Sequence, residues 1–418
     1  LCDWSSDVCS SDLSERALLS RPIEKSERRD LQAIFFFFGL GVMCLAPRLP
    51  EIKGNLGVST TFFGFLMSSG SIGAVTAHIT MGHVVHRLGV YRVLIVSSVF
   101  TYLSIGIMIQ LHNPWIYLVI NILSGFAWAS YHISINAQAL HRQSEDGGQI
   151  IPMLHGMWTA GAVSTAFIAI LISSSVSLQW HIYPLIIFVF LMKMRSIHRL
   201  RPLLLQGNEV TDDDEIITLK KMITGFSIDW VVSLGFLCAL MLEVSMGDWV
   251  TILARQEFEV SKSMAVIPYF LFMTSMIIGR ISFQRLKGER SDKEIVQPLV
   301  VMAGTVFLIS LFLGMHFHQN SPKLGYALFC LGVAITGIGI SFVGPLFFGY
   351  ASARSPKPGG VAIAELGALN QVLTFIGRGV ISVVAGVTSL PIAMTIPAVM
   401  LIGVAFFVAA ASQPRKTS

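Results

Sequence analysis

Charged side chains are scarce in this sequence of 418 residues. The 29 Lys and Arg and 24 Asp and Glu residues make up only 13% of the chain, roughly half the share found in soluble domains. Hydrophobic residues make up 53%, and the mean hydropathy is +0.69. Because so few polar groups cannot cover a water-facing surface, the composition excludes a soluble enzyme and a disordered chain. It predicts a protein embedded in a membrane.

Cysteine is also scarce, and motifs for catalysis are missing. Three of the five cysteines, Cys44, Cys238 and Cys330, lie inside apolar runs without the spacing of a metal site or disulfide framework. The sequence has no nucleophile elbow, no phosphate loop and no paired catalytic carboxylates. We therefore expect neither an enzyme nor a bound metal or organic cofactor.

The first residues do not fit the rest of the chain. Residues 2–13, CDWSSDVCSSDL, resemble the translation of a sequencing adapter, and the chain starts with Leu1 rather than Met. They lack the apolar core of a signal peptide. We expect residues 1–13 to be an artefact and residues 14–30 to be a charged tail.

Long apolar runs occupy most of the remaining sequence. A membrane-spanning helix needs ~20 mostly apolar residues, and twelve suitable runs lie near 31–48, 60–81, 91–111, 115–139, 151–173, 179–194, 226–252, 264–283, 296–316, 325–350, 361–387 and 390–411. Residues 195–225 carry most of the charge between the sixth and seventh runs and are predicted to be a water-exposed linker. The sequence thus predicts an all-α membrane protein with 12 transmembrane helices in two six-helix bundles, 31–194 and 226–411, followed by a tail at 412–418.

Basic residues predict the orientation of the chain. Loops rich in Lys and Arg stay on the cytoplasmic side. With the N-terminus inside, 23 of the 29 Lys and Arg residues fall in cytoplasmic segments, five fall in outer loops, and Arg378 lies within a span. We therefore expect both termini in the cytoplasm. The same bias accounts for the pI of 9.0 without a nucleic-acid partner.

Two related segments suggest an internal repeat. Residues 82–92 follow the second span and residues 279–290 follow the eighth, and each is a glycine followed by basic residues in a turn. Arg87 and Arg285 are 198 residues apart, and Val58 and Val260, which precede the same spans, are 202 apart. Six spans preserve orientation, so the halves are expected to be pseudo-symmetric parallel repeats.

Several motifs resemble those of the major facilitator superfamily over residues 31–411. The segment with Gly82, Arg87, Gly89 and Arg92 is similar to the superfamily's loop motif, with His86 where aspartate is usual. Four more segments are similar to a bacterial branch of YbjJ-type inner-membrane carriers and distantly to fucose permease: Pro47–Pro50 with Arg48, His155–Trp158, Glu243–Trp249, and Met276–Arg280 with Gly279. The resemblance implies two bundles around a central cavity, in the bacterial inner membrane.

Glu243 is the first candidate for a functional carboxylate. An ionisable side chain near mid-bilayer costs ~2.5–3.5 kcal/mol, so it should face a partner or a wet cavity. Arg378 lies at nearly the same depth in span eleven as Glu243 in span seven. Either Glu243 exchanges protons with the cavity or contacts the substrate, or the two residues form a structural ion pair.

Polar side chains also follow one face of span four at spacings of three and four residues. These are Asn121, Ser124, Trp128, His132 and Asn136. Since the resemblance implies that the fourth helix lines the cavity, we expect this stripe to face the substrate. Trp128 would stack on a sugar or aromatic ring and His132 would titrate near physiological pH, or both would pack in the core.

A second stripe lies in span eleven, and further candidates lie near the ends of spans. Gln371, Thr374 and Arg378 form either a substrate anchor or a structural contact. His155 and Trp158 open span five and are either motif residues or interfacial anchors. Asp248 and Trp249 approach the outer end of span seven and favour a gate. We group them with Arg48, Gly279 and Arg280 as gating or structural residues.

These features predict a secondary active transporter that moves a small polar solute, sugar-like in character, by alternating access. Proton coupling is a hypothesis that depends on Glu243 and His132. A drug/proton antiporter and a non-transporting membrane sensor or scaffold remain the alternatives, although HGMWTAGAVSTAF, residues 155–167, lacks the Gly-Pro motif of family antiporters. The expected partners are a small molecule and the lipid bilayer, and the protein is expected to be a monomer.

Overall fold

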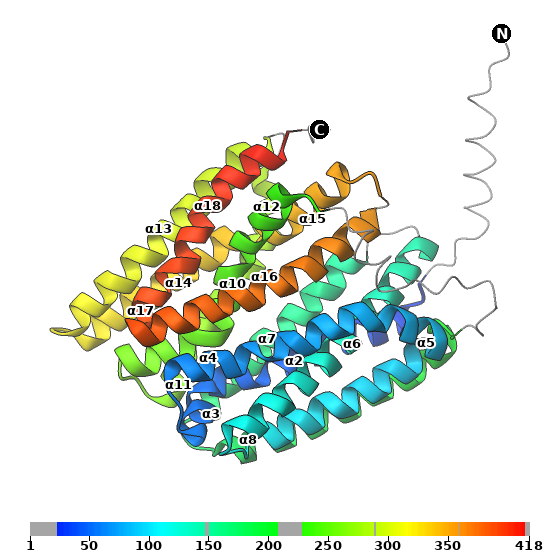
Figure 1. Ribbon diagram of the computed structural model, residues 1–418, viewed down its shortest axis with the longest axis horizontal. Helices are drawn as coiled ribbons and strands as arrows, with labels where there is room; N and C mark the ends of the chain where they lie inside the picture. Colours follow the sequence, from blue (N-terminus) through cyan, green and yellow to red (C-terminus); the bar gives the residue numbers. More distant parts are fainter. Residues whose placement is uncertain (1–22, 147–149, 208–227, 288–289, 358, 414–418) are drawn as a thin grey trace, which may run out of the picture.

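The computed structural model describes residues 23–146, 150–207, 228–287, 290–357 and 359–413. Within these ranges the regular structure is entirely helical. Helices from residues 23–207 pack together in one half of the molecule and helices from residues 228–413 in the other (Figure 1). We call these halves the N-terminal and C-terminal bundles.

The N-terminal bundle contains seven α-helices and two short 3₁₀ turns. They are α2 (Lys25–Val42), η1 (Met43–Arg48), α3 (Leu49–Leu56), α4 (Thr60–Ser68), α5 (Gly70–Met108), α6 (Pro114–Asp146), α7 (Ile151–Ile172), α8 (Leu178–Leu200) and η2 (Arg201–Leu203). The first helix begins at Lys25, so the end of the charged segment expected as a tail at 14–30 belongs to α2. Likewise, residues 195–203 were expected in the linker but continue α8 and η2.

The C-terminal bundle repeats this arrangement. Its helices are α10 (Trp230–Glu257), α11 (Lys262–Ala265), α12 (Ile267–Lys287), α13 (Asp292–His318), α14 (Pro322–Ile340), α15 (Val343–Arg354), α16 (Gly359–Val387), α17 (Leu390–Ala393) and α18 (Thr395–Ala411). The charged part of the linker, at 208–227, lies outside the described residues.

Twelve membrane crossings follow from these helices. Among the described residues, eleven segments are long and apolar enough to cross a bilayer, and one of them, Thr60–Met108, has 49 residues. At ~1.5 Å per residue it is more than twice as long as the ~30 Å hydrocarbon core, so it crosses twice. The break falls at Gly89, whose φ of 76° and ψ of 158° are not helical. The prediction of twelve crossings in an all-α membrane protein is confirmed.

The turn between these two crossings is shorter than the segment 82–92 that the sequence suggested. Residues 82–88 and 90–92 are helical, and the turn is confined to Gly89. A Cβ on Gly89 would lie 2.7 Å from the Gly207 backbone nitrogen, and Val90 N donates to Leu205 O at 2.9 Å. The glycine is needed because this φ, ψ combination is open almost only to glycine and because the chain after α8 packs directly against it.

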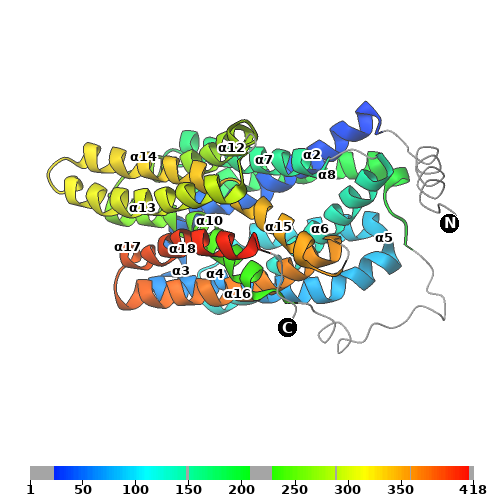
Figure 2. The same cartoon turned by 90° about the horizontal axis from the view of Figure 1, so that it is seen from above.

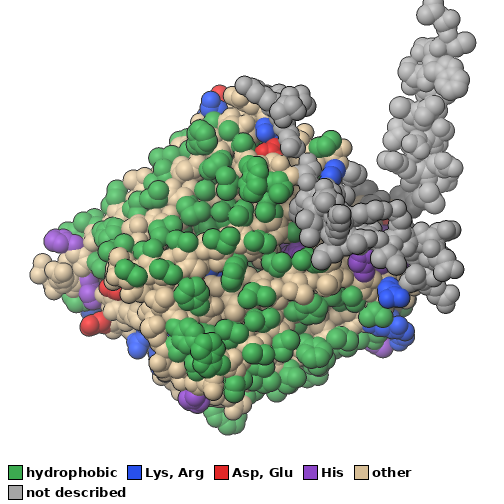
Figure 3. All heavy atoms as spheres, viewed as in Figure 1, with side chains coloured by type: hydrophobic (Ala, Val, Ile, Leu, Met, Phe, Trp, Pro, Cys, Tyr) green, Lys and Arg blue, Asp and Glu red, His purple; other side chains and the backbone are tan. Residues whose placement is uncertain are grey.

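The outer surface matches a lipid environment. Hydrophobic side chains are spread over the whole face in Figure 3, and charged side chains and histidines gather towards its edges. Trp180, Val387 and Phe406 are among the most exposed large hydrophobic side chains. Soluble monomers rarely expose so large an apolar area, so this surface is suited to hydrocarbon.

The bundle has two different ends. The termini end carries Ile23 and Gln413 together with Gly207 and Ile228, and the far end carries the turns at 57–59, 111–113, 173–177, 258–261, 319–321 and 388–389. Figure 2 shows the α13–α14 turn at one extreme of the molecule and the start of α2 towards the other. Each crossing therefore connects the termini end with the far end.

Candidate functional site

Matching ion pairs hold the termini end of each bundle. In the N-terminal bundle, Arg142 near the end of α6 binds Glu27 of α2, with Nε 2.5 Å from Oε1 and Nη2 donating to Oε2 at 3.2 Å. In the C-terminal bundle, Arg354 at the end of α15 lies 2.8 Å from Asp229, which caps α10. Both pairs join the first and fourth crossings of their bundle. This correspondence supports two parallel repeats.

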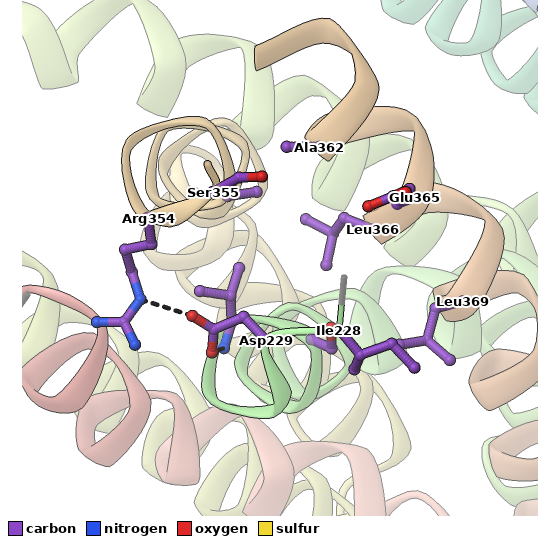
Figure 4. A pocket seen from close by; sticks show the side chains of 11 residues that line it. Ile228, Asp229, Arg354, Ser355, Ala362, Glu365, Leu366 and Leu369 are labelled. Carbon is purple, nitrogen blue, oxygen red and sulfur yellow. Dashed lines mark hydrogen bonds and ion pairs between the residues drawn. The ribbon is translucent and has the colours of Figure 1, made fainter. Parts of the chain in front are cut away.

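A cavity of about 30 Å³ lies beside the Asp229–Arg354 pair. Figure 4 shows the guanidinium of Arg354 turned towards Asp229, with Glu365 on the opposite wall. Glu365 pairs with Lys357 at 2.5 Å. The volume accommodates about one water molecule. This cavity is therefore too small to hold a transported solute.

The interface between the bundles is closed by small residues in its far half. A Cβ on Gly64 of α4 would lie 2.9 Å from Trp249 Cζ2 and would collide with Ser382 of α16. Thr251 Oγ1 donates to Ala46 O across the interface at 3.2 Å. Trp249, expected near a gate, is fully buried here, where a larger residue at position 64 has no space.

Polar contacts complete the closure at the far end. Lys262 Nζ of the C-terminal bundle lies 2.8 Å from Glu51 Oε1 of the N-terminal bundle. Ser174 N donates to Ser263 Oγ at 3.1 Å, and Ser263 N donates to Ser174 Oγ at 3.2 Å. Sequence reasoning missed these residues because short polar turns carry no distinctive motif.

Arg48 anchors this network from inside the N-terminal bundle. Its side chain is fully buried, and Nη2 donates to Glu51 Oε1 and to Val176 O, each at 3.1 Å. Its Nη1 lies 3.1 Å from His181 Nδ1. The arginine of the Pro47–Pro50 motif therefore positions Glu51, the residue that reaches across to Lys262.

Arg378 pairs with Asp248 and not with Glu243. Its Nε lies 2.8 Å from Oδ2 of Asp248, and Nη2 donates to Oδ1 at 3.0 Å. A structural Glu243–Arg378 pair was one of the two alternatives left open by the sequence, and the structure does not form it. The reason is geometric, because five residues along α10 rotate the side chain by about 140° past a full turn. Asp248 faces α16, and Glu243 faces another direction.

Arg280 connects Glu243 to the other bundle. It lies on α12, where Nε donates to Ser341 O at the break between α14 and α15 (2.9 Å), and Nη1 donates to Thr159 Oγ1 of α7 (3.3 Å). Its positive charge is close enough to act on both Glu243 and His155. Arg280 thus bonds to the N-terminal bundle through Thr159, and its charge acts on Glu243.

Gly279 makes this approach possible. A Cβ there would lie 2.8 Å from both Ile338 O and the Cβ of Ser341. Glycine lets α12 pack closely on the end of α14, where the helix break leaves Ser341 O free of an intrahelical partner. The Gly279–Arg280 motif therefore positions an arginine on a carbonyl at the bundle interface.

The structure brings together three of the polar residues of α6 and one from α7. The rings of Trp128 and His132 are parallel within 4°, with centroids 5.5 Å apart. His155 meets His132 edge to face at 6.3 Å, and its Nε2 lies 3.1 Å from Asn136 Oδ1. Thr159, one turn beyond His155, is bound by Arg280, whose charge also acts on Glu243, so we consider these residues and Glu243 together. We call them the central polar group.

Asn121 and Trp158 do not belong to this group. Asn121 Nδ2 donates to Leu66 O at 2.7 Å and Met67 O at 3.1 Å, and so ties α6 to the junction of α4 and α5. The backbone of Trp158 packs on Gly39 of α2, where a Cβ would lie 2.8 Å from the Trp158 carbonyl carbon. Both residues have structural contacts.

Several buried polar atoms lack a hydrogen-bond partner among the described residues. They include Trp128 Nε1, Thr374 Oγ1, Asn370 Oδ1 and Tyr269 OH. Each such atom costs roughly 1–3 kcal/mol. Thr374 comes from the predicted stripe on α16, in which Gln371 is half-buried.

Lys193 is a residue that sequence reasoning missed, because it was counted with the basic residues at the inner end of span six. It lies inside α8 and its side chain is buried. Aromatic rings of Phe38, Tyr102 and Tyr131 surround its ammonium group. A lysine followed within two residues by Arg195 is a weak signal, since both are typical of the cytoplasmic end of a helix.

Two bundles of six crossings, arranged as parallel repeats and joined by a polar interface, define a polytopic helical membrane protein. A family model described as the Major Facilitator Superfamily matches residues 32–378, and the chain belongs to that superfamily. It is therefore a membrane transporter and not an enzyme.

Two curated relatives extend the match over most of the chain. An uncharacterised MFS-type transporter of Yersinia pestis is 22% identical over 384 residues, which cover 91% of this chain and 94% of the relative. An uncharacterised transporter of Sinorhizobium fredii is 24% identical over 345 residues, 81% of this chain and 85% of the relative.

Solved structures share the fold. The nucleoside transporter NupG has a TM-score of 0.65 at 15% identity, covering 93% of this chain and all (100%) of NupG. A D-xylose–proton symporter has a TM-score of 0.66 at 13% identity, covering 92% of this chain and 96% of the symporter. At such identities the likeness concerns the fold alone.

Proposed function

We propose that this transporter moves a small polar solute across the bacterial inner membrane by alternating access, coupled to protons. The distribution of polar contacts carries the proposal. Among the described residues, bonds between the bundles lie at the far end and in the middle, as with Glu51–Lys262 and Thr159–Arg280. At the termini end, the two ion pairs Glu27–Arg142 and Asp229–Arg354 each lie within one bundle. Bundles that are joined at the far end and in the middle can rock about a central site.

The excess of Lys and Arg in segments at the termini end supports a cytoplasmic location for that end. With this orientation the far end faces the periplasm, and its closure is what we expect of an inward-facing state. Reporter fusions test the orientation. A cytoplasm-active reporter fused after Gln413 should be active, whereas activity of a periplasm-specific reporter at that position would reverse the assignment.

The central polar group supports a neutral polar solute that has a ring. The parallel rings of Trp128 and His132 offer an aromatic surface, on which sugar or heterocyclic rings pack well. Unpartnered atoms such as Thr374 Oγ1 and Trp128 Nε1 would bond solute hydroxyl or carbonyl groups. Because NupG is named a nucleoside transporter and the second neighbour a xylose–proton symporter, pentoses, hexoses and nucleosides form the first panel to test.

Glu243 is the proposed proton carrier. It lies within α10, away from the Asp248–Arg378 pair, and Arg280 is the cation that acts on it. A carboxylate of this kind can release its proton when an arginine approaches and take one up when the arginine moves away. Since Arg280 also binds Thr159 of the N-terminal bundle, movement between the bundles would change the distance that controls the proton.

Uptake by proteoliposomes tests the function. Compounds that raise the thermal stability of the purified protein are supplied as radiolabelled solutes, with and without an inward proton gradient. The proposal predicts accumulation that a protonophore abolishes. Accumulation that persists after collapse of the gradient would contradict proton coupling, and stabilisation without any flux would indicate a sensor.

A further inference from the structure

The N-terminal bundle holds a buried lysine that pairs with no carboxylate among the described residues. The Lys193 side chain is 1% exposed, and among the described residues it makes no ion pair. Its contacts are aromatic: Nζ lies 3.5 Å from the ring centroid of Tyr131, 5.0 Å from that of Tyr102 and 5.2 Å from that of Phe38. The three rings belong to α6, α5 and α2. We call them the ring cage.

The geometry is that of a cation–π site. An ammonium group within about 6 Å of a ring centroid is attracted to the negative face of the ring, most strongly when water is excluded. Cages of several rings are a known means of binding ammonium ligands. Three rings around one buried Nζ therefore take the place of the carboxylate that a membrane lysine ordinarily needs.

Residues of the surrounding helices hold the Tyr102 ring of this cage in position. A Cβ on Gly41 of α2 would lie 2.7 Å from Cε1 of Tyr102, so glycine leaves space for the ring. Phe190 of α8 meets Tyr102 edge to face at 6.1 Å and fixes it from another side. The position of Tyr102 thus depends on Gly41, which leaves space for its ring, and on Phe190, which packs against it. The ring of Tyr102 is therefore held in place beside Lys193 by its neighbours.

The ring cage also shares a wall with the central polar group. The Phe38 ring lies 5.2 Å from the Lys193 ammonium, and its centroid lies 6.0 Å from that of His132 and 6.4 Å from that of Trp128. Both ring pairs are close to parallel, at 26° and 24°. A shift of Phe38 would therefore move the support of the Trp128–His132 stack.

We propose that the ring cage is a binding site for a primary ammonium group, and that the Lys193 side chain is its built-in ligand. The site selects for charge and not only for apolar volume. Its occupant fixes Phe38, Tyr102 and Tyr131 in place and so joins α8 to the three other helices. This inference does not depend on which solute is transported or on proton coupling.

Chemical complementation tests the proposal. Lys193→Ala removes three carbons and the ammonium, which together correspond to n-propylammonium. We expect the variant to lose several degrees of thermal stability in detergent, and added n-propylammonium chloride at pH 7 to restore most of this loss. Sodium chloride at the same concentration controls for ionic strength, and 1-propanol supplies the same chain without charge. Equal recovery with 1-propanol would overturn the proposal.

Two further variants guard against loss of folding. Lys193→Met keeps most of the length of the side chain without its charge, so it should be less stable than the parent and should not respond to n-propylammonium. Tyr131→Leu removes the nearest ring, whereas Tyr131→Phe keeps the ring and removes only the hydroxyl. With Lys193 intact, the leucine variant should lose stability and the phenylalanine variant should keep it. Equal stability of both Tyr131 variants, or a Lys193→Met variant as stable as the parent, would show that the cage does not recognise charge.

Discussion

Arg378 faces both carboxylate oxygens of Asp248, with Nε 2.8 Å from Oδ2 and Nη2 3.0 Å from Oδ1. This pair joins α10 to α16 within the C-terminal bundle and leaves Glu243, one and a half turns earlier on α10, to the influence of Arg280. Two carboxylates on one helix therefore have different partners. Asp248 has a fixed structural partner, and Glu243 is next to an arginine that reaches the other bundle.

The Asp248–Arg378 pair should behave as a structural unit. Arg378→Met strands the carboxylate in a site where its side chain is only 14% exposed. Removal of one partner from a buried pair costs up to about 3–5 kcal/mol. We expect each of Arg378→Met and Asp248→Asn to lower the melting temperature of the purified protein, and the double variant to lose less than the sum. Strictly additive losses would show that the pair contributes no coupling.

Glu243→Gln should separate coupling from folding. Because Glu243 has no fixed ion pair among the described residues, the amide should preserve the yield of folded protein. Gradient-driven accumulation should fall to background while exchange of solute across the membrane continues. Glu257→Gln, at the end of the same helix, is the matched control and should leave both rates unchanged. Loss of exchange together with accumulation would assign Glu243 to solute binding instead.

Cross-linking of the far end should arrest transport. Ser174 and Ser263 exchange hydrogen bonds of 3.1 and 3.2 Å across the bundle interface. In a background without the native cysteines, the S174C/S263C double variant should form a disulfide under oxidising conditions and lose uptake. Reduction should restore uptake. Full transport by the oxidised protein would mean that the far end does not open during the cycle.

Gly64→Val should move the conformational equilibrium. The added side chain would meet Trp249 and Ser382 in the closed interface, so it disfavours this state and not the fold of either bundle. Cross-linking between cysteines at 174 and 263 should therefore fall several-fold. Gly156→Val in α7 is a suitable control, because a Cβ there meets nothing within 4 Å. An unchanged cross-linking yield in the Gly64 variant would contradict the closure described above.

Two glycines of one motif should respond in opposite ways to alanine. Gly89 has φ 76° and ψ 158°, and a non-glycine residue in such a conformation costs about 1–3 kcal/mol. Gly82 is helical and exposed, with nothing within 4 Å of its Cβ position, and helical alanine is favoured over glycine by up to about 1 kcal/mol. Gly89→Ala should lower the melting temperature, and Gly82→Ala should leave it unchanged or raise it. A tolerated Gly89→Ala would show that the turn can relax.

The sequence was sufficient to predict the twelve crossings because hydrocarbon imposes a length and a composition on each helix. Helix ends were less predictable. Glu27 and Asp30 resemble tail residues in sequence, yet they are buried in α2, since Arg142 pairs with Glu27 and Arg199 lies 3.6 Å from Asp30. A partner more than a hundred residues away decides whether such a carboxylate continues a helix.

The composition of the site was partly predictable and its pairing was not. Spacing placed Trp128, His132 and Asn136 on one face of α6, and the structure shows them close together. Glu243 and Arg378 were matched only because they lie at a similar depth in the membrane. Counting residues along a span gives the depth of a residue but not the helix face on which its side chain lies. The roles of Arg280 and Lys193 required knowledge of which helices are neighbours.

The ion pair between Glu51 and Lys262 is partly exposed to water, since the lysine side chain is 47% exposed. Exposed ion pairs contribute about 0–1 kcal/mol, and neutral hydrogen bonds such as those of Ser174 and Ser263 contribute about 0.5–1.5 kcal/mol each. A ligand that prefers one state by about 5.5 kcal/mol converts a 1:99 mixture into 99:1. The free energy of these polar contacts at the far end is therefore no larger than the preference that one small ligand can have for a single state. The binding of such a ligand is sufficient to open the far end without ATP hydrolysis.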